Sequence, residues 1–288
     1  MKNHIIQIFE EKKFWKLYQI HQDIRADVAM YKSDKSLFVS TFVPSDPNNF
    51  STKIIGEVKL ASPKFDNSRS VDPEEMIKFY IHNADVSAIS FLLNKKYFKG
   101  NLECIRTLKE LMRSEWVKKP LFYKEFVIAT NQIDQASGFG FDACLLIYKQ
   151  LKYVAAEENM TMIQFENYIK NLVDYANSKN IFTVLEVDNI DDMWHVLAMN
   201  MTPDQIWLGV NARALDTPNL ITDKNIHLNV YNTYHEQMSP YIRFAFSWVE
   251  DLAEVAGYNN MYHACLIGTY FSDTFAKLKI QQDEINKK

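Results

Sequence analysis

The chain has 288 residues, of which 47% are hydrophobic and 24% charged, so it can bury a large core within one α/β domain. A formal net charge of -4, with lysines and arginines in no long block, argues against a nucleic-acid surface. No stretch approaches the roughly 18 consecutive apolar residues of a membrane span, and the first residues lack the apolar core of a signal peptide. A cytoplasmic protein that does not bind membranes is therefore the default expectation.

The first 51 residues are predicted to form an N-terminal helical extension that ends in a linker. Apolar residues recur at helical spacing in HIIQIFEEKKFWKLYQIHQDI, which predicts one or two amphipathic helices. The stretch Val43–Phe50 is rich in Pro, Asp and Asn and favours turns. We expect the extension to pack as a lid or a brace on the domain at 52–288.

From Thr52 onward, short apolar runs alternate with amphipathic segments, which is typical of parallel βαβ units buried on both faces. The eight runs predicted as strands are Lys53–Leu60, Ser87–Leu93, Pro120–Phe126, Ala143–Tyr148, Ile181–Val187, Gln205–Val210, Ile242–Ser247 and Ala264–Ile267. Eight units indicate a closed (β/α)8 TIM barrel. The alternative, an open doubly wound sheet, would normally show a G-x-G-x-x-G turn, and none is present.

The three cysteines, Cys104, Cys144 and Cys265, are odd in number and far apart, and two of them lie in apolar runs. Buried free thiols are expected rather than disulfides or metal ligands. The seven histidines form no paired spacing with cysteine, so the sequence supports no zinc site.

Charged and polar residues follow several of the predicted strands, where a barrel of this kind places its active site. They are Glu57, Lys59, Lys124, Glu186, Asn211, Arg213, Ser247, Gly268 and Thr269. Lysines and carboxylates at one mouth favour general acid–base chemistry. Five of these residues also have a structural interpretation: Lys124 as a rim partner of Glu125 or Glu103, Glu186 as a partner of Lys124, Asn211 as a turn cap, Ser247 as a helix N-cap and Gly268 as a tight turn.

The ends of the last two strands have the character of a phosphate site. Ser247 and Thr269 offer hydroxyl groups, and the loop backbone at Gly268 offers N–H donors. Phe91, Phe98 and Phe122 are candidates to sandwich an aromatic ring at the mouth.

Five motifs in this order resemble the indole-3-glycerol phosphate synthase family of tryptophan biosynthesis. They are Glu57-Val-Lys59-Leu-Ala-Ser62-Pro63, Tyr97-Phe98-Lys-Gly100, Lys124-Glu-Phe126, Leu185-Glu186-Val187 and Gly209-Val-Asn211-Ala-Arg213-Ala-Leu215. The resemblance implies conversion of 1-(2-carboxyphenylamino)-1-deoxyribulose 5-phosphate into indole-3-glycerol phosphate, CO₂ and water. It also implies no metal or organic cofactor, a phosphorylated small-molecule substrate, and other tryptophan-pathway enzymes as possible partners.

The resemblance also implies a role for each matching residue. Lys124 falls on the general acid of ring closure, Glu186 on the general base of dehydration, and Lys59 on a second lysine for the substrate's oxygens. Glu57 falls on the carboxylate that holds the lysines, and Asn211 on an asparagine that stabilises the intermediate. The implied substrate- and phosphate-binding positions are Ser62, Lys64, Phe98, Arg213, Ser247, Gly268 and Thr269.

Four positions differ from the family pattern: Phe246 stands for a glutamate, Trp248 for a glycine, Lys64 for a serine and Ala214 for an aspartate. We expect Lys64 to offset part of the change by adding a cation near the phosphate or the substrate carboxylate. Two alternatives therefore stay open beside the synthase. One is a related enzyme for a different phosphorylated or aromatic substrate, and the other is a binding protein without catalysis.

Overall fold

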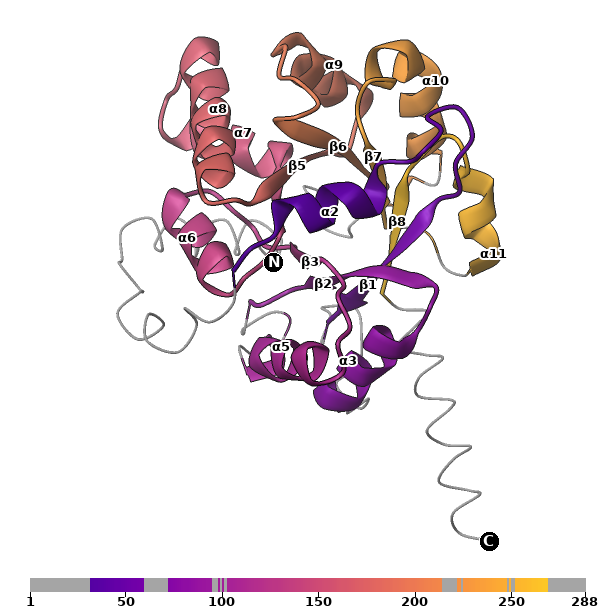
Figure 1. Cartoon of the computed structure of the whole chain (residues 1–288). Coiled ribbons are helices and arrows are strands. Elements are labelled where there is room, and N and C mark those ends of the chain that lie inside the picture. Colours follow the sequence, from indigo (N-terminus) through magenta and orange to yellow (C-terminus); the bar gives the residue numbers. More distant parts are fainter. Residues whose placement is uncertain are drawn as a thin grey trace, which may run out of the picture.

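A computed structural model describes residues 32–59, 72–94, 98, 100, 103–213, 222–223, 225–247, 249 and 252–268. Eight parallel strands pair in sequence order, and β1 also pairs with β8, so the sheet is a closed barrel. Helices surround the strands (Figure 1). The predicted TIM barrel is thereby confirmed, and the open sheet is excluded.

All eight predicted strands are present, with ends that differ by a few residues. Their bounds are β1 Lys53–Val58, β2 Val86–Phe91, β3 Leu121–Tyr123, β4 Ala143–Ile147, β5 Phe182–Val187, β6 Ile206–Asn211, β7 Arg243–Phe246 and β8 Ala264–Ile267. The largest difference is at β3, which ends before Lys124. Beyond this end, the buried carboxylate of Glu125 accepts the backbone N–H groups of Leu93 and Asn94, which ties the chain to the loop after β2.

The predicted amphipathic segments PEEMIKFYIHN, LECIRTLKELMRS, IQFENYIKNLVDYANS and IDDMWHVLAMN form α3, α5, α8 and α9. The described helices are α2 Lys35–Phe42, α3 Pro73–His82, α5 Glu103–Ser114, α6 Thr130–Gly138, α7 Tyr148–Glu157, α8 Met162–Ser178, α9 Ile190–Ala198, α10 Ile226–Met238 and α11 Leu252–Val255, followed by the 3₁₀ turn η2 Ala256–Tyr258. Caps fix several starts: Thr161 and Gln164 form a capping box at α8, and the Asn189 side chain accepts the N–H of Asp192 at α9. Within the described residues, no helix is long and apolar enough to cross a bilayer.

Side chains alternate between the barrel interior and the layer under the helices, as the pleat of a strand requires. On β1, Ile55 belongs to the interior cluster, while Ile54 and Val58 belong to the outer one. The same alternation turns Glu57 inward. All three cysteines are free and buried, as predicted.

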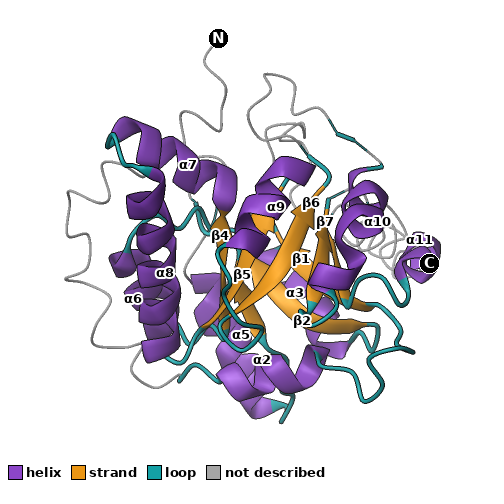
Figure 2. Ribbon diagram, turned by 90° about the horizontal axis from the view of Figure 1, so that it is seen from above, coloured by secondary structure: helices purple, strands orange, loops and turns teal. Residues whose placement is uncertain are grey.

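Helix α2 was not predicted, and it closes the barrel at the N-terminal ends of the strands. Phe38 and Phe42 are fully buried among Trp207, Phe244 and other residues that begin strands. Burial of two such rings contributes about 1.5–3 kcal/mol each, which an eight-residue helix needs because it is too short to be stable alone. Figure 2 shows α2 beneath the strands. This part of the extension is therefore a brace, whereas the amphipathic helices predicted further upstream lie outside the described residues.

Candidate active site

Three charged side chains from β1 and the end of β3 meet inside the barrel. The Glu57 carboxylate lies 2.7 Å from Lys59 Nζ through Oε2 and 3.2 Å from Lys124 Nζ through Oε1. Glu57 is 3% exposed, whereas the side chains of Lys59 and Lys124 are 17% and 19% exposed. One buried carboxylate thus holds two ammonium groups that keep access to solvent. The ion-pair partner of Lys124 is thus Glu57, and the alternative in which it pairs with Glu125 or Glu103 is wrong.

Glu57 is ionised over the whole physiological range. Burial alone would raise its pKa, but the charges of Lys59 and Lys124 outweigh that effect and lower the pKa to about 2. Its backbone is fixed as well, since the Tyr80 hydroxyl donates to the Glu57 carbonyl at 3.0 Å. The Tyr80 ring would lie 2.8 Å from a Cβ at Gly56, so this glycine lets α3 approach the strand.

Glu186, on β5, has a different environment from Glu57. Its Oε1 accepts a hydrogen bond of 3.0 Å from Asn211 Nδ2, and its buried Oε2 has no hydrogen-bond partner within the described part of the chain. Burial raises its pKa to about 7, opposed by the charge of Lys124 and the hydrogen bond from Asn211. Near neutral pH, Glu57 is therefore ionised while Glu186 is partly protonated, and such a pair of carboxyl groups is expected of an acid–base site.

Asn211 caps the turn that follows β6, as predicted for its structural interpretation, and it also contacts Glu186. Its Oδ1 accepts the backbone N–H of Arg213 at 3.0 Å, while its amide nitrogen faces Glu186. The Nε of Arg213 is buried and has no hydrogen-bond partner among the described side chains and backbone. A buried guanidinium N–H in that state is an unused donor, of the type that binds anions in proteins.

The end of β7 combines an apolar wall with a strained turn. Phe246 is fully buried, stacks on Phe122 with centroids 6.1 Å apart, and would contact a Cβ at Gly209 at 2.5 Å. Its ring occupies space above Gly209 beside the Glu186 backbone. The next residue, Ser247, has φ of 63°, a left-handed conformation that is uncommon outside glycine.

Gly268, after β8, provides room for the Glu57 carboxylate. A Cβ at Gly268 would lie 2.7 Å from Glu57 Oε2, which is closer than real Cβ contacts. Gly268 is not in the left-handed conformation that would require a glycine, because its φ is not positive. Its small size matters through its contact with the ion-paired carboxylate.

Gly268→Ala is accordingly expected to displace Glu57 and, if acid–base chemistry takes place at this mouth, to lower its kcat about tenfold, equivalent to about 1.4 kcal/mol. Stability should change by less than that, because the displaced group is a side chain. The matched control is Gly138→Ala, since a Cβ there meets nothing within 4 Å. Steady-state kinetics of both variants test this, and equal kcat values for the two would contradict it.

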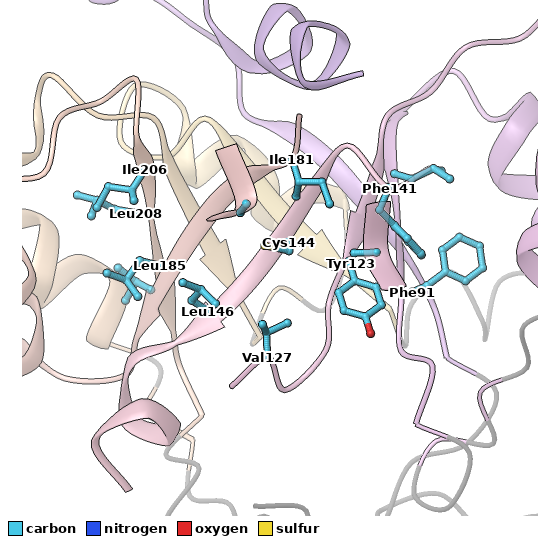
Figure 3. Packing of buried hydrophobic residues seen from close by; sticks show 14 of the residues in the cluster. Phe91, Tyr123, Val127, Phe141, Cys144, Leu146, Ile181, Leu185, Ile206 and Leu208 are labelled. Carbon is cyan, nitrogen blue, oxygen red and sulfur yellow. The ribbon is translucent and has the colours of Figure 1, made fainter. Parts of the chain in front are cut away.

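The aromatic candidates separate into three environments. Phe98 stacks on Phe126 with centroids 6.3 Å apart and is partly buried against the interior cluster, so it stays a candidate for the mouth. The prediction for Phe91 is wrong, because this ring lies in the outer layer against Phe141, as Figure 3 shows. Phe122 is also not at the mouth, since it is fully buried in the barrel interior in contact with Phe38 of α2.

Ser62, Lys64 and Thr269 lie outside the described residues, as does Trp248. Their predicted roles therefore stay predictions. The sequence reasoning missed Tyr80 and His227, whose contacts reach the backbone of site strands. Neither carries a motif, and their only signal is a polar group on an otherwise apolar helix face.

The fold and the site define a (β/α)8-barrel protein with a lysine–carboxylate cluster at the mouth of the barrel. A family model described as indole-3-glycerol phosphate synthase matches residues 7–281. The chain therefore belongs to the indole-3-glycerol phosphate synthase family.

Similar proteins carry the same description. Indole-3-glycerol phosphate synthase of Aquifex aeolicus is 35% identical over 166 residues, covering 58% of this chain and 56% of the relative. The Aliarcobacter butzleri protein of that name is 34% identical over 180 residues, covering 62% and 59%. The chain thus spans less than two thirds of the length of these two relatives. A crystal structure of an HpcH/Hpal aldolase/citrate lyase family protein from Burkholderia cenocepacia shares the fold alone, with a TM-score of 0.53, 8% identity and coverage of 88% of this chain and 99% of that one.

Proposed function

We propose that the chain is an active indole-3-glycerol phosphate synthase that closes the indole ring of 1-(2-carboxyphenylamino)-1-deoxyribulose 5-phosphate. The observation that carries the proposal is the pairing of two lysines with Glu57 in the same mouth as a Glu186 carboxyl with a pKa of about 7. The reaction needs an ammonium donor and a separate group that exchanges a proton near neutral pH, and these residues supply both.

In the proposed sequence, Lys124 donates a proton to the ketone oxygen while the aromatic carbon forms the new ring bond to the carbonyl carbon. Loss of CO₂ from the substrate then returns its electron pair to the ring. Glu186 next removes a proton from the intermediate, and the hydroxyl leaves as water after protonation by a lysine. Lys59 binds the substrate carboxylate and oxygens, and Glu57 holds both lysines in place.

The phosphate side of the substrate is assigned to the ends of β6, β7 and β8. The buried, unpartnered Nε of Arg213 and the left-handed turn at Ser247 support this assignment. In the proposal, Gly268, Thr269, Ser62 and Lys64 complete this side, and Phe98 contacts the aromatic ring. Other tryptophan-pathway enzymes, which supply this substrate or use its product, are the proposed partners.

The test is incubation of the purified chain with the carboxyphenylamino-deoxyribulose phosphate, followed by indole fluorescence. Formation of indole-3-glycerol phosphate at a rate proportional to enzyme concentration supports the proposal. Absence of product at high enzyme concentration would contradict it. Tight binding of the substrate without turnover would instead favour a binding protein.

The fully buried Phe246 favours a second candidate, a family member with a different phosphorylated or aromatic substrate. An apolar ring stacked on Phe122 stands where the family pattern has a carboxylate, so this wall of the interior is less polar. Competition of other aromatic amino-sugar phosphates in the fluorescence assay discriminates the two candidates. A competitor with a higher kcat/KM than the carboxyphenyl substrate would favour the second.

A further inference from the structure

His227 is a buried titratable side chain that the proposed reaction does not use. It is the second residue of α10 and is 2% exposed. Its ring packs edge-on against Tyr258 and Tyr262, with centroids 5.4 and 5.6 Å away. The Tyr262 hydroxyl donates to the His227 carbonyl at 2.8 Å, so the backbone of the residue is held as firmly as its ring.

The imidazole makes hydrogen bonds through both nitrogens. Its Nε2 lies 3.0 Å from the Val210 carbonyl oxygen and 3.1 Å from the Phe246 carbonyl oxygen, and its Nδ1 lies 3.0 Å from the Tyr258 hydroxyl. Carbonyl oxygens only accept, so Nε2 carries the hydrogen and Nδ1 accepts from Tyr258. Burial lowers the pKa of His227 to about 4, against the opposing effect of the two carbonyls and of Asp223, so the ring is neutral at neutral pH.

The two carbonyls belong to the residues immediately before Asn211 and Ser247. They lie at the end of the ladder between β6 and β7, whose last register pair is Asn211 with Phe246. Beyond that pair, the Phe246 carbonyl also accepts the N–H of Ala212 at 3.0 Å. A single imidazole thus joins two strands at the point where both enter the site.

The turn at Ser247 needs such support. A left-handed non-glycine residue costs about 1 kcal/mol and persists where the surrounding structure determines it. The bond from His227 fixes the peptide unit that begins this turn. The Asn211 side chain has hydrogen bonds of its own, to Glu186 and to the Arg213 N–H, whereas the peptide unit before Ser247 is held by the Ala212 N–H and by His227. Ser247 therefore depends more strongly on the histidine.

We propose that His227 is a positioning residue that holds the ends of β6 and β7 together, so that the Ser247 turn is presented to the phosphate of the substrate. The inference rests on the proposed function for the identity of the substrate. The other part of the inference, that His227 shapes an anion site, does not require the chain to turn over this substrate.

The experiment compares His227→Leu, which removes the donor at similar length, with His227→Gln, whose amide reaches the Nε2 position and donates two hydrogens. For His227→Leu, we expect KM for the phosphorylated substrate to rise about tenfold, inhibition by inorganic phosphate to weaken equally, and kcat to change less than about threefold. His227→Gln should restore KM and the inhibition constant for phosphate to within about twofold of their values in the unmodified enzyme.

The matched control is His263→Leu. His263 is also buried, but it lies before β8, accepts the Arg243 N–H and stacks on Phe50 at the opposite end of the barrel. This variant should lose stability without a change in KM or in phosphate inhibition.

Unchanged KM and phosphate inhibition in His227→Leu would overturn the inference, and so would a glutamine variant no better than leucine. If the leucine variant does not fold, Tyr258→Phe decides, because it removes only the hydroxyl that donates to Nδ1 and helps to orient the imidazole. KM should then rise about threefold, and an unchanged value would overturn the inference. An inactive unmodified enzyme would contradict the proposed function alone, and calorimetric titration of inorganic phosphate into the same variants would still test His227.

Discussion

Lys124→Met is expected to lower kcat about a thousandfold while KM stays within about threefold. Methionine keeps the apolar stem but cannot donate a proton, so under the proposed function the loss falls on the transition state of ring closure. Glu57 stays paired with Lys59 in this variant, which limits the damage to the rest of the site. Steady-state kinetics by indole fluorescence provide the measurement.

The control for this substitution lies at the other end of the same strand. Lys119 precedes β3 and donates to the carbonyls of Tyr80 and Asn83 at 2.8 and 2.7 Å, away from the mouth. Lys119→Met should lower stability and leave kcat unchanged. A rise in KM alone for Lys124→Met would show that this lysine binds substrate and does not transfer a proton.

Glu186→Gln is expected to lower kcat about 10²- to 10⁴-fold and, at about pH 8, to stabilise the protein by about 1–3 kcal/mol. The pKa of Glu186 is about 7 in the folded state against 4.5 ordinarily. Between these values, the folded protein binds a proton that the unfolded chain has lost, so the contribution of Glu186 to stability decreases as pH rises through this window. Glutamine cannot ionise, and it can keep the hydrogen bond from Asn211.

Urea denaturation of the two proteins at about pH 5 and about pH 8 measures this effect. The gain from glutamine should be larger at the higher pH, and an equal gain at both would show that ionisation is not its cause. Glu57→Gln serves as a control, because its expected effect on stability has the opposite sign. The pKa of Glu57 is about 2, so its stabilisation is complete above 4.5 and is lost as pH falls through 2. Its substitution should therefore destabilise the protein at both pH values.

The eight strands could be predicted because each is an apolar run buried on both faces, a pattern that local sequence displays. The mouth could be predicted in outline for a related reason. Once the strands of a barrel are known, the residues at their carboxyl ends converge, and the structure brings Glu57, Lys59 and Lys124 into contact as well as Glu186 and Asn211.

Other features depend on side-chain direction and on contacts between distant segments, which no local pattern records. Phe91 is the last residue of β2, at the end of the strand where the mouth lies, but the pleat turns it outward, so its predicted role failed. Helix α2 is short and gains its stability from Trp207 and Phe244, far along the chain. The contact between Gly268 and Glu57 likewise joins the last strand to the first.

The contacts of α2 also have a consequence for the order of folding during synthesis. The backbone N–H of Asp34 donates to Asp142, the Lys35 amine donates to Asn177, and Asn180 donates to the Ser33 carbonyl. These partners emerge from the ribosome a hundred or more residues after α2. The first helix that the structure describes is thus made early and docks late, and until then its two phenylalanines are without their partners. A nascent chain that stalls before β5 would expose an apolar segment of the kind that chaperones bind.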